Sequence, residues 1–168
     1  GNIDVLDAFR TYVYQAKVTG SNDNGLSVCA NDESQEGTLD SKVQTGNAGG
    51  FGGSLLDGSV KNSSVTGLNK VKAKNYAGGF VGHMGKSGVV DLDEAGVGTG
   101  KLLNATAGVL DIFGSHSDNC SVIGIPVGFT ISSESGNEPI SGGFVGYADL
   151  GRMSNCNVEN IKKVASDQ

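Results

Sequence analysis

The densest group of acidic side chains in this chain of 168 residues consists of Asp91, Asp93 and Glu94. In an extended strand Asp91 and Asp93 project from the same side, which is the outer side if the apolar residues around them face a core. Such a pair could bind a cation or a sugar, and polysaccharide lyases and glycosidases need converging carboxylates, often beside arginine. Arginine occurs only at Arg10 and Arg152. The sequence therefore favours a solvated outer face or loop over a catalytic pair.

The two histidines give little support for nucleophilic catalysis. His83 follows a GGFVG phrase at a position where Ser54 and Tyr147 stand in other copies of the phrase, so an exposed side chain is expected. His116 lies in 114–118, which reads as a turn. Because no G-x-S-x-G elbow accompanies them, a serine–histidine–aspartate triad is not expected. Asp57 and Asp149 read as turn aspartates.

Two segments offer the oxygen ligands that calcium prefers, namely 21–25 (SNDNG) and 31–33 (NDE). Neither has the D-x-[DN]-x-[DN]-G order of an EF-hand or the nonapeptide of calcium-binding β-rolls. We therefore expect no metal site and no cofactor, while calcium binding by a loop stays an open alternative.

The three cysteines, Cys29, Cys120 and Cys156, are too few and too scattered for a disulfide framework or a zinc site. Cys120 and Cys156 occupy the same place in a repeated phrase where Ser63 stands in another copy. We expect small buried side chains stacked on adjacent strands. A bridge between them is not excluded by geometry, because neighbouring strands lie about 4.8 Å apart.

Composition points to an ordered β protein. Glycine accounts for 28 residues, more than double the usual share of about 7%, whereas there are only 2 prolines and no tryptophan. Apolar β-branched residues are spaced among turn residues. With a net charge of −6 and no basic groove, nucleic acid is not an expected partner. No apolar run approaches the length of about 18 residues needed for a membrane span.

A six-residue phrase recurs three times, as AGGFGG at 48–53, AGGFVG at 77–82 and SGGFVG at 141–146. A second phrase follows at a fixed offset in two of these blocks, at 62–65 (NSSV) and 155–158 (NCNV), and a third copy stands at 119–122 (NCSV). Repeats about 30 residues long are typical of arrays whose units stack and share one elongated core.

Degenerate copies extend the array. VLD-x-F phrases begin at Val5 and Val109 and take the place of GGFVG, so five units are predicted, with starts near Val5, Gly49, Gly78, Val109 and Gly142. The long first interval must carry an insertion, and 21–25, 31–37, 94–100 and 132–139 read as loops. The segments 4–9 and 159–164 have apolar residues at helical spacing and are candidate short terminal helices.

The distinctive residues of the repeat have structural roles in this interpretation. Glycine pairs fit tight corners, and the phenylalanines are expected to stack in one interior column. The asparagines of the second phrase fit turns, and the cysteine and valine that follow fit the core. The predicted structural residues are Gly49, Gly50, Phe51, Val65, Gly78, Gly79, Phe80, Cys120, Val122, Gly142, Gly143, Phe144, Cys156 and Val158.

The alternation of GGFVG with N-C-x-V and a following valine or isoleucine strand resembles the glycine-rich repeats, related to the GLUG motif, of large bacterial surface proteins. The resemblance covers most of 48–164. It implies an all-β, parallel β-solenoid (a right-handed β-helix) of about five rungs, forming a single domain over 1–168 in an exported protein located outside the cell, on its surface or in its wall. The abrupt ends of the chain are interpreted as those of a fragment of a larger protein, so neighbouring domains are expected partners.

Two classes of function follow. The first is a non-catalytic, adhesin-like repeat module that acts as a structural spacer or as an adhesion surface for a host or bacterial glycan or protein. An exposed aromatic or acidic stripe would favour adhesion. The alternative is a carbohydrate-active enzyme, a polysaccharide lyase or glycosidase, on a β-helix. The sequence favours the first class, because its distinctive residues are corner and core residues and the repeat carries no catalytic residue.

Overall fold

The computed structural model describes residues 11–21, 24–30, 46–85, 114–134 and 139–167. These residues form seventeen strands and no helix, so the fold is all-β. The first seven strands are β1 (Thr11–Tyr14), β2 (Lys17–Thr19), β3 (Leu26–Ala30), β4 (Ala48–Gly49), β5 (Gly52–Leu56), β6 (Gly58–Lys61) and β7 (Ser64–Ala73). The next five are β8 (Tyr76–Gly78), β9 (Val81–Gly85), β10 (Ser115–Asp118), β11 (Ser121–Gly124) and β12 (Phe129–Ser133). The last five are β13 (Ile140–Gly142), β14 (Val145–Ala148), β15 (Gly151–Ser154), β16 (Asn157–Glu159) and β17 (Ile161–Ser166).

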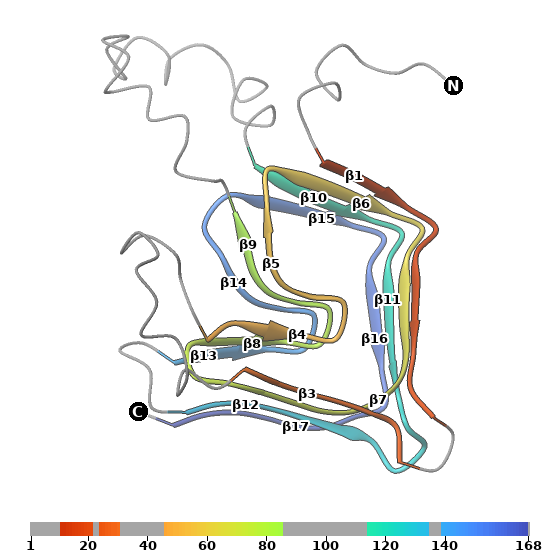
Figure 1. Cartoon of the computed structure of the whole chain (residues 1–168), viewed down its shortest axis with the longest axis vertical. Coiled ribbons are helices and arrows are strands. Elements are labelled where there is room, and N and C mark those ends of the chain that lie inside the picture. Colours follow the sequence, from red (N-terminus) through yellow and green to blue (C-terminus); the bar gives the residue numbers. More distant parts are fainter. Residues whose placement is uncertain (1–10, 22–23, 31–45, 86–113, 135–138, 168) are drawn as a thin grey trace, which may run out of the picture.

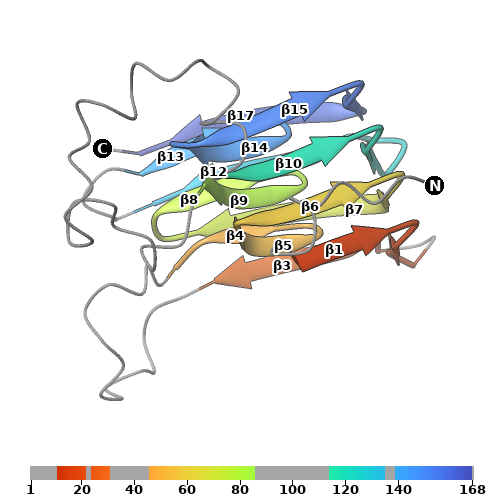
Figure 2. The ribbon, with the colours of Figure 1, turned by 90° about the horizontal axis from the view of Figure 1, so that it is seen from above.

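The strands lie in four stacked levels, from β1–β3 at one end to β13–β17 at the other (Figure 2). The second level contains β4–β7 and the third contains β8–β12. Each strand pairs with strands of the levels beside it, and all these pairs are parallel. Parallel pairing is what repeated units produce when each unit runs in the same direction as the unit before it.

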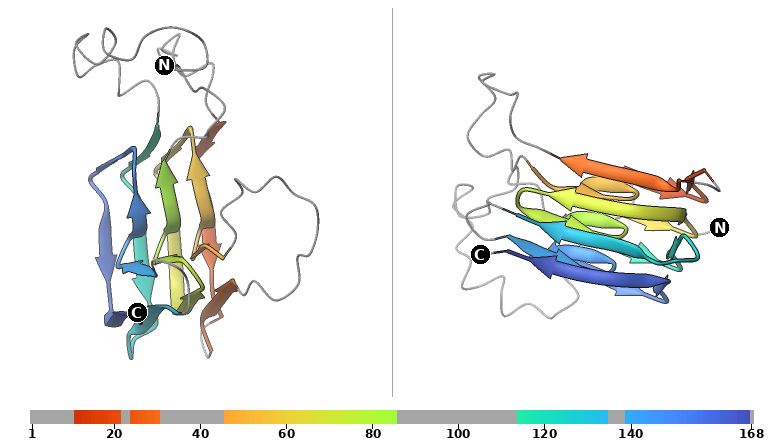
Figure 3. Two further views of the ribbon diagram at one scale, coloured as in Figure 1. Left: turned by 90° about the vertical axis from the view of Figure 1, so that its left-hand side faces the viewer. Right: turned by 90° about the horizontal axis from the view of Figure 1, so that it is seen from below.

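Pairing between levels forms four sheets, which are seen end-on in Figure 1. One contains β1, β6, β10 and β15, and a seven-stranded sheet contains β2, β3, β7, β11, β12, β16 and β17. Two three-stranded sheets contain β4, β8 and β13, and β5, β9 and β14. The strands of each sheet lie side by side in the two views of Figure 3.

The repeated phrases set the register between levels. Val18, Val65, Val122 and Val158 lie opposite one another on four successive strands, as the alignment of the phrases predicts. The corner phrases are aligned in the same way, since Ala48 pairs with Ala77 and Ala77 with Ser141. Equivalent residues of the repeat are therefore neighbours in space.

Five units are predicted, but the described residues form four levels, so the predicted number is wrong. The repeat alignment predicts separate units for the block starting at Gly78 and the phrase ending at Val122. However, β9 pairs with β5 and β14, and β10 pairs with β6 and β15, so both strands lie between the second and fourth levels. The two phrases belong to one level that is interrupted in sequence by 86–113. That segment, including the start near Val109, lies outside the described residues, as does the start near Val5.

The core is a column of repeat residues. The rings of Phe51 and Phe80 stack with centroids 4.5 Å apart, and those of Phe80 and Phe144 with centroids 4.8 Å apart. Phe80 is completely buried because a ring covers each of its faces. Other apolar residues of the same core are also fully buried, namely Val60, Val65, Leu68, Val71, Val122, Phe129 and Ile131.

The segment 159–164 is not the predicted helix: Glu159 ends β16, Asn160 lies between the strands, and 161–164 belong to β17. Ile161 lies opposite Phe129 and Val164 opposite Ile131, and the register shifts between these pairs because Lys162 is an additional, unpaired residue. This β-bulge places two apolar residues three positions apart on one side of a strand, a spacing that imitates a helix. The other predicted helix, at 4–9, lies outside the described residues.

The predicted loop at 132–139 begins later than expected, because Ser132 and Ser133 belong to β12 and Ser133 is buried. No helix in the part of the chain that the structure describes is long and apolar enough to span a membrane.

Candidate binding surface

Several of the sequence-predicted candidates cannot be placed. Asp91, Asp93 and Glu94 lie outside the described residues, as do 31–33 and the central residues of 21–25. Among the residues that are described, no three histidine, cysteine, aspartate or glutamate side chains are grouped in a way that could hold a metal ion.

His83 is buried, with 6% of its surface exposed, so the prediction of an exposed side chain is wrong. Its strand lies between those of Ser54 and Tyr147, and the rings of Tyr76 and Tyr147 lie 5.6 and 5.5 Å from the imidazole. Its Nε2 atom lies 3.2 Å from a carboxylate oxygen of Asp149. Ser54, His83 and Tyr147 lie opposite one another, but their exposure differs: Ser54 is exposed, His83 is buried and Tyr147 is half-buried.

The three asparagines of the second phrase form a corner. Asn62, Asn119 and Asn155 have φ angles of 52°, 51° and 51°, a left-handed conformation that asparagine tolerates. The side-chain amide of Asn119 donates to the side-chain oxygen of Asn62 over 2.6 Å, which links two levels. The amide of Asn155 instead donates to the carboxylate of Asp118.

The residue after each asparagine closes the same corner. The Ser63 hydroxyl donates to the Lys61 carbonyl, and the thiols of Cys120 and Cys156 donate to the carbonyls two residues before them. Serine and cysteine therefore make the same contact in this row. Cys120 is buried and Cys156 is half-buried, and both are free thiols. Burial raises the pKa of Cys120, so this thiol is protonated at neutral pH.

A shallow depression lies on the outside of this corner. It is lined by polar side chains from neighbouring levels, including Asn62, Ser64, Asn119, Ser121 and Asn157. The depression is open to solvent and holds no charged group among its lining residues. It lacks the acid and base that a hydrolytic site needs.

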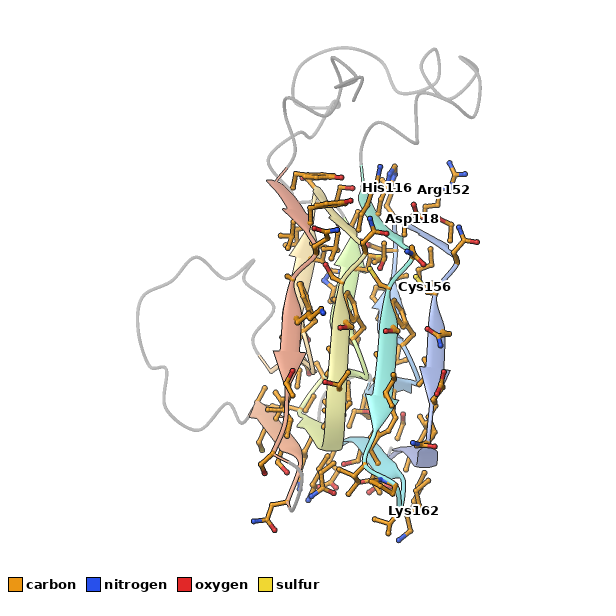
Figure 4. The ribbon with its side chains drawn as sticks, turned by 90° about the vertical axis from the view of Figure 1, so that its right-hand side faces the viewer. His116, Asp118, Arg152, Cys156 and Lys162 are labelled. Atoms are coloured by element: carbon orange, nitrogen blue, oxygen red, sulfur yellow. The ribbon has the colours of Figure 1, made fainter. Side chains whose placement is uncertain are left out.

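The outward side of the sheet β1-β6-β10-β15 has a different composition. Val13 packs against the core and Val60 is buried within it, so the alternate residues of these strands point outward. His116 lies in strand β10, so the prediction of a turn there is wrong. In Figure 4 His116 and Arg152 point away from the body of the stack. We call this surface the tyrosine face; its side chains are Tyr12, Tyr14, Lys61, His116, Asp118 and Arg152.

Two aromatic rings are exposed on the tyrosine face. Tyr12 is 48% and Tyr14 52% exposed, and their rings stack with centroids 6.2 Å apart. The Lys61 ammonium lies 5.8 Å from the centre of the Tyr12 ring, within range of a cation–π interaction. Tyrosine gives a large contact area at a small cost in side-chain entropy, and its hydroxyl can form hydrogen bonds.

Asp118 adds a fixed negative charge to the same surface. Its carboxylate accepts hydrogen bonds from the Ser154 hydroxyl at 2.6 Å and the Asn155 amide at 3.2 Å. These bonds favour the charged form, so they hold the pKa of Asp118 below its ordinary value. The tyrosine face therefore combines aromatic rings with both signs of charge on a continuous sheet.

The sequence reasoning did not single out the tyrosine face. The alternation of aromatic residues in Thr11-Tyr12-Val13-Tyr14 is a signal of two rings on one side of a strand. The charged residues beside them are distant in sequence, and only the register of the sheet brings Lys61 and Asp118 into the same row as Tyr14.

Comparisons with known proteins agree with the repeat. Neither the curated proteins nor the solved structures contain a match to this chain. Among protein families, residues 44–72 match the GLUG motif. The matched segment includes the first glycine phrase, the first asparagine phrase and most of β7. The GLUG motif is a repeat module found in extracellular proteins, and the segment that is similar to it covers most of the second level.

Proposed function

We propose that this chain is a non-catalytic repeat module of a secreted or cell-surface bacterial protein, and that its tyrosine face binds an extracellular glycan or protein. In this proposal the stacked levels are rungs of a parallel β-solenoid, which holds the surface rigid.

The use of the repeated residues supports a non-catalytic role. Phe80, Val65, Val122 and Cys120 are buried in the core, and the asparagines close corners. The glycine pairs lie where strands pass close to the neighbouring level. Since these positions support the architecture, they are not free to supply an acid, a base or a nucleophile. The match of residues 44–72 to an extracellular repeat module supports a location outside the cell.

The exposure of Tyr12 and Tyr14 is the observation that favours adhesion over a spacer. A spacer needs only a polar surface, whereas about half of each tyrosine is left in contact with water here. Aromatic residues are enriched at the centres of binding surfaces, where they contribute most of the affinity. Binding to a rigid sheet also avoids the loss of conformational entropy that ordering a flexible loop would require.

A binding screen of the purified chain against plant, mucin and bacterial polysaccharides and extracellular matrix proteins tests this proposal. For the ligand found, the double variant Tyr12→Ala/Tyr14→Ala is expected to bind at least about tenfold more weakly, corresponding to the loss of about 1.4 kcal/mol or more. Val127→Ala is the matched control, because Val127 is 76% exposed and lies outside the tyrosine face.

The outcomes separate adhesion from the other functions. If the double variant still binds the ligand, the binding site lies outside the tyrosine face. If no ligand is found, the result favours a spacer. Saturable cleavage of a polysaccharide, abolished by Asp91→Asn or Asp93→Asn, would overturn the non-catalytic reading. Binding without product, lost in the tyrosine variant, is the expected result.

A further inference from the structure

The core is incomplete at the fourth level. Phe144, Cys156 and Val158 are only half-buried, although their counterparts in the third level are fully buried. Met153, Ile161 and Val164 are 46%, 43% and 40% exposed on the same level. These residues would be covered if another level were stacked on β15, β16 and β17.

The first level is incomplete in the same way. Val18, Leu26 and Val28 are half-buried, whereas Val65, Leu68 and Val71 directly opposite them are fully buried. Among the strands that the structure describes, β1, β2 and β3 pair only with strands of the second level. Edge strands with unpaired backbone groups are templates for pairing with another chain.

The two ends carry equivalent residues in the same order. In the register of the stack, Val158 of one copy would meet Val18 of the next, Ile161 would meet Leu26 and Val164 would meet Val28. Each contact would repeat one that already exists inside the stack, such as Val122 on Val65. The ends are therefore complementary in shape and in apolar character.

The positions of the lysines favour one orientation of this contact. In one row of the seven-stranded sheet, the residues are Ser27, Lys70, Thr130 and Lys163, so each lysine is followed by a neutral residue. Continuing the stack from Lys163 to Ser27 of a second copy preserves the alternation. The Lys17 side chain of that copy would also lie beside Asn157, diagonal to Glu159.

A symmetric contact between two identical ends would lack this advantage. Two fourth-level ends would bring Lys162 and Lys163 of both copies to one interface, and two first-level ends would bring Lys17 of both copies to one interface without Glu159. Like charges on directly opposed strands are destabilising.

We propose that copies of this chain associate head to tail, with β15, β16 and β17 of one copy pairing in parallel with β1, β2 and β3 of the next. Such a contact is heterologous, so it leaves one free end on each side and leads to open chains of copies. The tyrosine face runs along the side of the stack, so the contact would place the tyrosine faces of successive copies in one continuous row.

Sedimentation velocity over a range of concentrations tests the association. The 17.0 kDa chain is expected to show an average mass that rises with concentration. Ile161→Lys/Val164→Lys, which adds two cations at exposed positions of the fourth level, should weaken association at least about tenfold. Val127→Lys is the matched control and should associate like the unmodified chain, since Val127 is exposed in a turn between β11 and β12. Circular dichroism of each variant confirms that the fold is retained.

A mixing experiment tests the orientation. Thr19→Glu places an anion at an exposed position of the first level, where it lies opposite the neutral Thr66 of its own chain and would meet Glu159 of another copy. Head-to-tail contact predicts that this variant and Ile161→Lys/Val164→Lys are each monomeric alone and form a heterodimer that does not grow when mixed.

Other outcomes overturn the proposal. An unmodified chain that stays monomeric at all concentrations shows that the ends do not associate. Dimerisation of the Thr19→Glu variant alone shows a symmetric contact between fourth-level ends, and dimerisation of Ile161→Lys/Val164→Lys alone shows a symmetric contact between first-level ends.

Discussion

The phenylalanine column is the clearest case of single residues determining the stability of the fold. Phe80 is completely buried between two rings, whereas Phe144 ends the column and is half-buried. We expect Phe80→Ala to lower the free energy of unfolding by about 3–5 kcal/mol, because the substitution leaves a cavity between two levels. Chemical denaturation followed by circular dichroism measures this change.

Two controls accompany this measurement. Phe144→Ala should cost less than Phe80→Ala, because water already reaches one side of that ring. Val127→Ala should change stability by no more than about 0.5 kcal/mol, as expected of an exposed side chain. A loss below about 1 kcal/mol for Phe80→Ala would show that the column is not part of the core.

The corner thiols give a second prediction at this scale. Cys120→Ser should fold with a loss of about 1 kcal/mol, because Ser63 already makes the equivalent hydrogen bond in the level below. Alkylation under denaturing, non-reducing conditions should modify all three thiols of the unmodified chain. Labelling of only one thiol would reveal a disulfide bridge and contradict the prediction.

Asp118 gives a prediction about pH. Because the Ser154 hydroxyl donates to its carboxylate, its pKa in the folded chain lies below the ordinary value of 3.8. The stabilisation from this group is therefore complete above the unfolded-state pKa and is lost as the pH falls through the lower folded-state pKa. Ser154→Ala should raise the pKa of Asp118 in an NMR titration of the carboxyl carbon. A pKa that does not change would show that the hydrogen bond is absent in solution.

At the scale of elements, the glycine pairs decide how closely the levels approach one another. A Cβ atom at Gly79 would overlap the backbone carbonyl of Gly143 in the next level. Gly79→Ala should therefore destabilise the fold by several times more than Gly52→Ala, since a Cβ atom at Gly52 meets no atom closer than 4.0 Å. Thermal unfolding of the two variants compares them directly. Equal effects would mean that close packing of the levels is not the reason for the glycine pair.

The register of the levels could be predicted from the sequence because the same residues recur at the same offsets. Val18, Val65, Val122 and Val158 were aligned by their phrases, and they pair in space. The number of levels could not be predicted in this way. Offsets alone do not distinguish a degenerate unit from a level interrupted in sequence by 86–113.

Two local errors have physical causes that the sequence pattern does not contain. The β-bulge at Lys162 brings Ile161 and Val164 to the same side of a strand, so the strand shows helical spacing. His83 is buried by contacts with Tyr76 and Tyr147, which come from other strands. Both depend on contacts with residues of other strands, which the residue pattern of a single segment does not contain. The tyrosine face was missed for the same reason, because its charged residues come from different levels.

At the scale of the whole molecule, the stack separates architecture from recognition. The repeated residues hold the levels together, and the residues that differ between levels decide what the outer surfaces can bind. On the tyrosine face, one row changes from Tyr12 to Ser59, His116 and Arg152 across the four levels. A repeat of this kind can vary its outer surface without changing its core.

The central claim is that the repeated phrases place equivalent residues of successive units side by side in one parallel stack. A map of proton–proton contacts by NOE spectroscopy on the labelled chain tests it most directly. We predict contacts between the rings of Phe51 and Phe80 and of Phe80 and Phe144, together with cross-strand contacts from Val122 to both Val65 and Val158. Phenylalanine rings without mutual contacts, or an antiparallel pattern around Val122, would contradict the account.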